Sequence, residues 1–239
     1  MTARPSPNRD LLERTARRLR PILDEVVFVG GHVAELLVTD PAAVRVRQTN
    51  DVDVIVRVIS RTAYHRLGER LKDLGYREDT TEGAPLCRWR DPDGLRLDVM
   101  PLDPDVLGFS NAWYEPALLQ AVAYVITADL VIRIPPPPIF LATKWAAYDG
   151  RGGGDPLGSH DLEDIITVVA GRPETVDEVK TAALDVRRYV ASSTSRFLTD
   201  PAARDVIAGA LPDVWRDPAA LRDVEERFRA IAATSARTH

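Results

Sequence analysis

Apolar residues recur along this chain with two different spacings, and the two spacings predict different elements. Alternating apolar positions and short valine-rich runs predict strands at 26–29, 51–56, 86–90, 95–100, 122–127 and 130–134. Apolar positions three or four residues apart predict helices at 8–20, 60–75, 139–148, 160–170, 174–197, 201–210 and 218–232. Strands and helices are interleaved in the first part, and only helices follow. The pattern therefore predicts an α+β fold with a small mixed sheet flanked by helices.

Four consecutive prolines, Pro135 to Pro138, separate the two parts of this pattern. Proline removes a backbone donor and fixes φ, so the run predicts a rigid boundary between two regions. We expect a core domain at 1–135 and a C-terminal helical region at 136–239. The segment from Pro101 to Pro116 is rich in turn-forming residues and is expected to be a loop near the site.

Two carboxylates open the strand predicted at 51–56. Side chains alternate along a strand, so Asp51 and Asp53 share one face while Val52 and Val54 take the other. Two carboxylates this close repel each other unless a cation lies between them, and carboxylate oxygens are the ligands that Mg²⁺ prefers. The alternative for this pair is an ordinary polar strand end. The pattern predicts a Mg²⁺ site.

A glycine pair lies one element earlier, between the strand at 26–29 and a short predicted helix. Gly30 and Gly31 allow the backbone to approach a bulky anion, and their amides favour phosphate. A tight turn without a ligand is the alternative. Together with the two carboxylates, the glycines predict a site for a nucleotide and a metal ion.

A third carboxylate, Asp98, lies on the strand predicted at 95–100. A turn-forming segment, Asp91 to Gly94, precedes this strand and predicts a hairpin with the strand at 86–90. Asp103 is a further carboxylate shortly after this strand. The alternative is that Asp98 is a solvated residue on an edge strand.

An apolar strand, Gly30–Gly31, a helix and then Asp51–Val52–Asp53 on a second strand together resemble the nucleotidyltransferase fold of the DNA polymerase beta superfamily. The resemblance implies a nucleotidyltransferase core in which three carboxylates hold Mg²⁺ and the glycines cradle the triphosphate of an NTP. Asp98 would be the third carboxylate and complete the metal site, and Asp103 is the fallback for this role. His32 stands where the superfamily commonly has serine or threonine. Imidazole can also donate a hydrogen bond to phosphate.

The segments 140–151 and 159–165 extend the resemblance to the AbiE-type and MenT-type nucleotidyltransferase toxins. In those proteins a helical lysine, a variable loop and an aspartate opening the next helix follow the core. The resemblance implies that Lys144 and Asp161 line the cleft near Asp51, that the acceptor is tRNA, and that a cognate antitoxin exists. Lys144 would bind the nucleotide, and its removal would leave the melting temperature nearly unchanged. A structural ion pair is the alternative for Lys144.

The composition of the chain excludes few of these functions. The formal net charge of −5 argues against a surface coated with basic residues for nonspecific nucleic-acid binding, although Arg45 or Arg47 could still meet phosphate. The chain has a single cysteine, and the sequence contains neither a signal-like stretch nor a membrane-spanning run, so we expect a cytoplasmic protein without a membrane partner. Two other functions stay open: transfer to a small molecule or a protein side chain, and a non-catalytic binding protein on the same fold.

Overall fold

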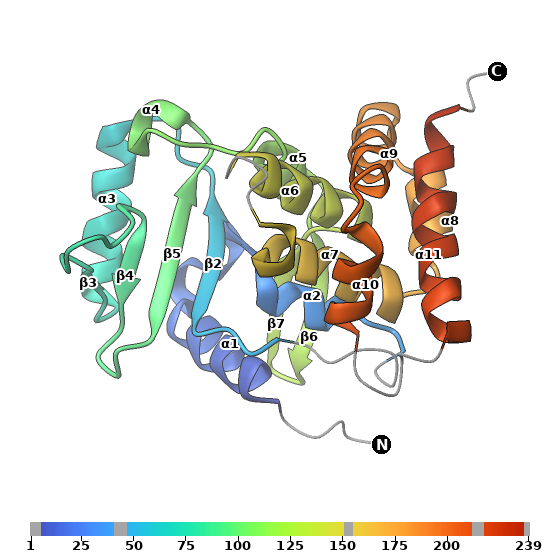
Figure 1. The fold of residues 1–239 in the computed structure, drawn as a ribbon. Helices are drawn as coiled ribbons and strands as arrows, with labels where there is room; N and C mark the ends of the chain where they lie inside the picture. Colours follow the sequence, from blue (N-terminus) through green and yellow to red (C-terminus); the bar gives the residue numbers. More distant parts are fainter. Residues whose placement is uncertain (1–5, 41–46, 151–154, 212–217, 237–239) are drawn as a thin grey trace. The chain divides into compact units, whose positions relative to one another are not determined.

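The computed structural model describes residues 6–40, 47–150, 155–211 and 218–236 (Figure 1). Contacts within the chain group it into two compact units. The first unit comprises Met1–Val33 and Gln48–Pro136, and the second comprises Ala34–Arg47 and Pro137–His239. The division falls inside helix α2 (Gly31–Leu37).

A five-stranded mixed sheet forms the centre of the first unit, with the strand order β1-β2-β5-β4-β3. The strands are β1 (Val26–Val29), β2 (Asp51–Val56), β3 (Arg77–Glu78), β4 (Arg88–Arg90) and β5 (Arg96–Pro101). Strand β2 runs parallel to β5 and antiparallel to β1, and β4 runs antiparallel to β5. The predicted α+β class with a small mixed sheet is confirmed, and β3 is an additional strand.

A separate two-stranded sheet follows in the first unit. Strands β6 (Val122–Thr127) and β7 (Leu130–Ile134) form an antiparallel hairpin with the predicted bounds. The side chains of Leu130, Ile132 and Ile134 are buried and alternate with more exposed positions, as a half-buried strand requires.

Helix α3 (Arg61–Asp73) covers one face of the five-stranded sheet. Its first turn is capped by Ser60, whose Oγ accepts a hydrogen bond from the amide of Ala63 at 3.2 Å. The hydroxyl of Tyr64 donates to the carbonyl of Val99 at 3.1 Å, and Gly68 leaves room for the ring of Trp89. The helix predicted at 60–75 is therefore present, and the apolar face of the sheet packs beneath it.

Helix α1 (Pro7–Arg18) precedes this sheet and continues into the 3-10 helix η1 (Arg20–Glu25). The hydroxyl of Ser6 caps α1 by accepting from the amide of Arg9 at 3.1 Å. Proline at the first helical position lacks an amide hydrogen that a helix start would leave unpaired anyway. The helix predicted at 8–20 is therefore present, but it starts at Pro7 and ends at Arg18.

The loop predicted from Pro101 to Pro116 is wrong in part, because it contains α4 (Pro104–Leu107) and the start of α5 (Tyr114–Leu119). Asp103 caps α4, since its Oδ1 accepts from the amide of Asp105 at 2.9 Å. Asp followed by Pro is a common start of a helix, whereas the many turn-forming residues of this segment favour a loop. The two signals conflict, and the structure follows the first at Asp103.

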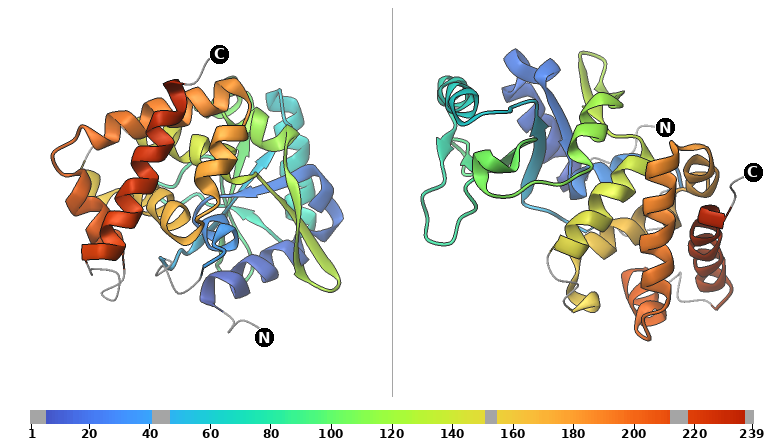
Figure 2. Two further views of the ribbon diagram at one scale, coloured as in Figure 1. Left: turned by 90° about the vertical axis from the view of Figure 1, so that its right-hand side faces the viewer. Right: turned by 90° about the horizontal axis from the view of Figure 1, so that it is seen from above.

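The second unit is built from helices (Figure 2). They are α6 (Pro137–Gly150), η2 (Pro156–Gly158), α7 (His160–Gly171), α8 (Thr175–Thr181), α9 (Leu184–Leu198), α10 (Ala203–Ala210), α11 (Pro218–Ala232) and η4 (Ala233–Ala236). Within the described ranges, no helix is both long and apolar enough to span a membrane.

The helix predicted at 174–197 is interrupted in the structure. Ala182 and Ala183 adopt extended backbone, with ψ values of 162° and 147°, and they separate α8 from α9. Val179 and Val186 on either side are both buried. Alanine favours helix, so packing of the two apolar faces, and no local sequence signal, decides this break.

Candidate active site

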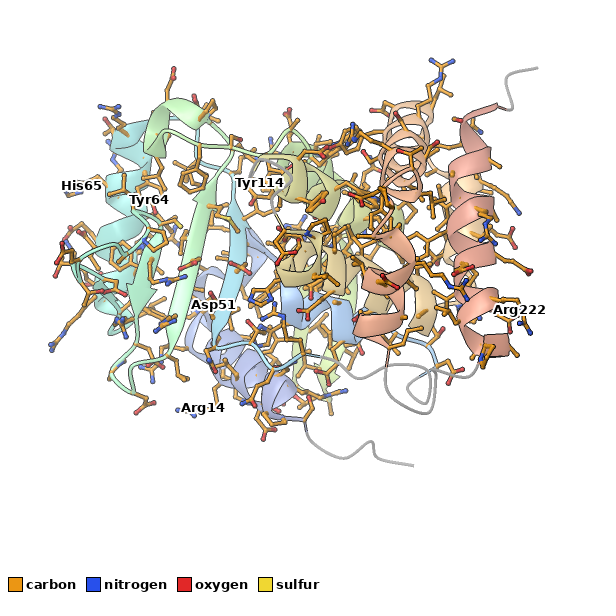
Figure 3. All side chains as sticks on the ribbon, viewed as in Figure 1. Arg14, Asp51, Tyr64, His65, Tyr114 and Arg222 are labelled. Atoms are coloured by element: carbon orange, nitrogen blue, oxygen red, sulfur yellow. The ribbon has the colours of Figure 1, made fainter. Side chains whose placement is uncertain are left out.

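The register of the sheet places three carboxylates on one face. Asp53 of β2 lies directly opposite Asp98 of β5 in a parallel pair, and Asp51 lies two residues before Asp53. Residues opposite each other in a parallel pair, and residues two apart on one strand, point to the same face. Asp51, at the start of β2, is labelled in Figure 3. This face is the one that α3 leaves uncovered.

Arg88 of β4 joins two of these carboxylates. Its Nε and Nη2 donate to Oδ1 and Oδ2 of Asp98 at 2.8 and 2.7 Å, which makes this ion pair bidentate. Nη2 also donates to Oδ2 of Asp51 at 3.2 Å. The side chain of Arg88 is only 16% exposed and that of Asp98 10%. The hydrogen bonds to Asp98 raise the pKa of Arg88 further above its usual value. A fixed positive charge therefore lies between Asp51 and Asp98.

Asp51 is also held from the other side, through helix α1. The Oδ1 of Asn8 accepts from the amide of Thr49 at 3.0 Å, and the hydroxyl of Thr49 donates to Oδ1 of Asp51 at 2.7 Å. Asn8 and Thr49 are both buried. A hydrogen-bonded chain from a packed helix thus orients one of the candidate carboxylates, which is how supporting residues fix a functional side chain.

Gly30 lies directly against Asp53. Its φ of +78° is in the left-handed region, and a Cβ built there would lie 1.9 Å from Oδ2 of Asp53. Only glycine allows this backbone to adopt that conformation and to approach the carboxylate so closely. The glycine turn therefore lies against the carboxylate face, and its use as a site for a nucleotide and a metal ion stays a prediction.

Substitution of Gly30 by alanine is expected to displace the carboxylate of Asp53 as well as strain the backbone. The matched control is Gly94→Ala, because Gly94 has a φ of +82° with nothing within 4 Å of its missing Cβ. We expect Gly94→Ala to lower the free energy of unfolding by about 1 kcal/mol and Gly30→Ala to lower it by roughly 2 kcal/mol or more. Denaturant titration measures both. Equal losses would contradict the close contact between Gly30 and Asp53.

Cys87, the residue before Arg88, lies close enough to this face for its carboxylates to affect the pKa of the thiol. The thiol is buried, and burial raises its pKa to about 12, with the negative charges of Asp98 and Asp53 as the next causes. A thiol with such a pKa stays protonated at neutral pH and is a poor nucleophile. Cys87 is therefore a packing residue beneath the site.

His32 is 1% exposed. In this conformation its imidazole lies out of reach of a ligand in solvent, so the predicted contact with a triphosphate would require the side chain to move. Gly30 and Gly31 are buried as well, so their backbone amides have the same restriction. The nucleotide-binding role of all three residues stays a prediction.

Lys144 and Asp161, the remaining predicted site residues, lie in the second unit and contact each other. The Nζ of Lys144 lies 3.4 Å from Oδ1 of Asp161 and 2.5 Å from Oδ2 of Asp164, and all three side chains are largely buried. Arg47 approaches the same group, with Nη2 at 3.9 Å from Asp164 and Nε at 3.3 Å from Glu163. Arg45 lies outside the described residues. The ion pair that the sequence left as the alternative for Lys144 is therefore present, and the distance of this group from Asp51 stays a prediction.

This ion pair changes the expected effect of removing Lys144. Lys144→Met would leave two buried carboxylates without their closest cation, which costs about 3–5 kcal/mol and lowers the melting temperature by roughly 10 °C. The expectation of an unchanged melting temperature is replaced for this reason. Lys180→Met is the control, since Lys180 pairs with Asp177 at the surface, and it should shift the melting temperature by less than about 3 °C. Lost NTP binding with an unchanged melting temperature would restore the original expectation.

The donor chemistry of the carboxylate face fits Mg²⁺, because three carboxylates share one face of two adjacent strands. Their present arrangement does not form a metal cage. In the part of the chain that the structure describes, no group of three or more histidine, cysteine, aspartate or glutamate side chains is arranged to hold a metal ion. Asp51 and Asp98 instead contact Arg88. Binding of a metal ion therefore requires these contacts to loosen.

Sequence reasoning missed three residues of these sites: Arg88, Thr49 and Asp164. Arg88 lies opposite Asp98 in the antiparallel pair of β4 and β5, so counting residues back across the predicted hairpin turn would have found it. Asp164 lies three residues after Asp161 on one helix, a spacing that places both on the same face. No comparable spacing in the sequence predicts the hydrogen bond from Thr49 to Asp51.

No protein-family model and no curated protein matches this sequence. Solved structures that resemble it include an antigenic nucleotidyltransferase-like protein from Paracoccidioides brasiliensis, with 16% identity over 93% of this chain and 92% of that chain, and a TM-score of 0.48. JHP933 from Helicobacter pylori is 15% identical over 95% of this chain and 90% of that chain, with a TM-score of 0.41. Both scores are too low to support a conclusion about function, so the function is argued from the side chains of this chain.

Proposed function

We propose that this chain is a Mg²⁺-dependent nucleotidyltransferase, which moves a nucleoside monophosphate from an NTP to an acceptor hydroxyl. One observation carries the proposal: Asp51, Asp53 and Asp98 share one sheet face, and the left-handed Gly30 lies against Asp53. Carboxylates that can hold hard cations, beside a glycine turn whose backbone amides can bind phosphate, are the two parts that this reaction needs.

Each residue then has a defined role in the transfer. Asp51 and Asp53 would hold Mg²⁺, which supplies positive charge to the attacking and leaving oxygens. The backbone of Gly30 and Gly31, with His32 if its side chain moves, would position the triphosphate. The acceptor oxygen forms a bond to the α-phosphorus while the bond from this phosphorus to the bridging oxygen breaks and pyrophosphate leaves. Asp98 would help to hold the metal and take the hydroxyl proton.

Arg88 has a role in the state without metal. Three carboxylates on one face repel each other, and the guanidinium of Arg88 neutralises part of that charge. Asp51 and Asp98 would have to give up their contacts with Arg88 in order to hold Mg²⁺. The released guanidinium would then be near the triphosphate, for which its planar donors are suited.

We propose tRNA as the acceptor and the toxin of a toxin–antitoxin pair as the biological role, following the resemblance of the segments that contain Lys144 and Asp161. Lys144 would reach the nucleotide only if it left Asp164, its closest carboxylate. A small molecule or a protein side chain is the alternative acceptor. A second function, a binding protein without catalysis, is favoured by one observation: Arg88 already occupies the place between Asp51 and Asp98 that a catalytic metal would take.

The proposal is tested by incubating the full chain with each of the four NTPs labelled at the α-phosphate, Mg²⁺, and one acceptor class at a time. The acceptors are total tRNA, the protein itself, and a set of small hydroxyl compounds. We expect label in tRNA, dependent on Mg²⁺. Label only in protein or in a small molecule would keep the reaction and replace the acceptor.

A further inference from the structure

A cavity of about 550 Å³ lies in the first unit, and the proposed transfer reaction does not use it. Its walls come from η1, the end of β2 and the loop after it, α3, α5 and β7. We call it the arginine pocket, and it is lined by Asp24, Glu25, Val56, Arg57, Val58, Ala63, Arg66, Leu67, Arg70, Leu118, Leu119 and Arg133. Its volume falls within the range of small-molecule sites, which is about 300–1,000 Å³.

The arginine pocket is distinct from the carboxylate face. Asp51 begins β2, and Arg57 follows the last residue of this strand. A strand rises about 3.3 Å per residue, so the two residues are separated by roughly 20 Å along β2. A ligand in the arginine pocket would therefore not contact Asp51.

The pocket carries an excess of positive charge, because four arginines face two carboxylates, a formal charge of +2. Only Arg70 has its charge neutralised by a close partner, since it binds both oxygens of Glu25 at 2.6 and 2.8 Å. Arg133 donates to backbone carbonyls, those of Asp24 at 3.1 Å and Leu118 at 2.9 Å. Carbonyls position this guanidinium without cancelling its charge.

Two of the arginines are available to bind a ligand. Arg57 and Arg66 line the pocket with exposed side chains, and neither has a hydrogen bond or an ion pair with any of the described residues. Guanidinium groups present planar donors that match the oxygens of carboxylate and phosphate. The unneutralised charge and the open donors both favour an anion.

The rest of the lining is apolar and selects among anions. Val56, Val58, Leu67 and Leu118 are buried side chains that form the floor and expose little area, whereas Leu119 is 60% exposed at the rim and supplies apolar surface that a ligand can cover. Inorganic phosphate or sulfate would leave this apolar surface in water. A ligand with an apolar group would cover it, at a gain of about 25 cal/mol for each Å² removed from water.

We propose that the arginine pocket binds a small organic anion, in which a phosphate or carboxylate group is attached to an apolar or aromatic group. The anionic group lies between Arg57 and Arg66, and the apolar group lies against Leu119. The proposal does not depend on nucleotidyl transfer.

Isothermal titration of the full chain with phenyl phosphate, benzoate, inorganic phosphate and benzyl alcohol tests this site. We expect one molecule of phenyl phosphate or benzoate to bind per chain. Inorganic phosphate and neutral benzyl alcohol should bind at least about tenfold more weakly, because the first has no apolar group and the second has no negative charge for the arginines. The stronger of the two organic anions identifies the preferred anionic group.

Two pairs of substitutions locate the binding. Arg57→Gln with Arg66→Gln should weaken the organic anion at least tenfold. Arg77→Gln with Arg222→Gln removes the same charge from two exposed arginines outside the pocket and should leave its affinity within twofold. Asp53→Asn should also leave it unchanged. Equal affinity in the two double variants, weaker binding in Asp53→Asn, or no organic anion bound more tightly than inorganic phosphate would overturn the proposal.

Discussion

Asp53→Asn is expected to reduce nucleotidyl transfer by a factor of about 10³ or more while the chain stays folded. Asparagine keeps the size of the side chain and removes the charge that would hold the metal ions at the reacting oxygens. Asp53 belongs to a group of three carboxylates facing the guanidinium of Arg88, so its loss relieves repulsion. We therefore expect the melting temperature to stay within about 4 °C, the shift that corresponds to about 1 kcal/mol in a chain of this size.

Asp103→Asn is the matched control for this substitution. Asp103 is the fallback carboxylate of the sequence, and the structure uses it to cap α4. Asparagine caps a helix as well as aspartate does, so this variant should keep both transfer and stability. Loss of transfer in Asp103→Asn would show that the third carboxylate is Asp103 and not Asp98, and full activity in Asp53→Asn would show that Asp53 does not hold the metal. Unfolding of Asp53→Asn would assign that residue a structural role.

Arg88→Gln is expected to tighten divalent metal binding by about tenfold. The variant removes the cation that competes for Asp51 and Asp98, and hydrogen bonds between charged groups of this kind contribute about 1.5–3 kcal/mol. Without metal, the buried Asp98 loses its partner, so the free energy of unfolding should fall by about 3 kcal/mol. Saturating Mg²⁺ should restore much of this loss. Mn²⁺ titration followed by electron paramagnetic resonance measures the affinity, and thermal unfolding with and without Mg²⁺ measures the stability.

The control for Arg88→Gln is Arg90→Gln, on the same strand. Arg90 binds Asp79 at 2.8 Å and no predicted metal ligand, so its loss should leave the Mn²⁺ affinity unchanged. Transfer activity is measured separately from metal affinity. The variant lacks the guanidinium that would contact the triphosphate, so its activity can fall even though it binds metal more tightly. An Arg88→Gln variant with unchanged or weaker Mn²⁺ binding would mean that Asp51 and Asp98 are not metal ligands, and it would favour the binding protein without catalysis.

Much of this fold could be predicted from the sequence, because its elements carry strong local signals. The valines of β2 and the hairpin residues of β6 and β7 specify strands by their spacing, and Ser60 with Gly75 marks the limits of α3. The exceptions have no such signal or two conflicting ones. Ala182 and Ala183 separate α8 from α9 although alanine favours helix. Asp103, which caps α4, lies within a segment dominated by turn-forming residues.

The candidate site was predictable where it depends on the period of a strand and unpredictable where it depends on side-chain partners. Alternation along β2 and β5 places Asp51, Asp53 and Asp98 on one face as soon as the two strands pair in parallel. The partners of Arg88 and Lys144 depend on rotamers and on which strand or helix face lies opposite. For Lys144 the sequence offered both an anion in the cleft and a carboxylate nearby, and the fold supplies the carboxylate of Asp164.

The most direct measurement of the central claim compares ATP labelled at the α-phosphate with ATP labelled at the γ-phosphate, in parallel reactions with Mg²⁺ and total tRNA. The analysis is repeated with whichever NTP the first screen favours. We expect label from the α-position in the acceptor, one pyrophosphate released for each nucleotide transferred, and no transfer from the γ-position, with all of these lost in Asp53→Asn. Transfer from the γ-position, or no transfer of either label with any NTP and acceptor while folded protein binds Mn²⁺, would contradict nucleotidyl transfer by the face that contains Asp51, Asp53 and Asp98.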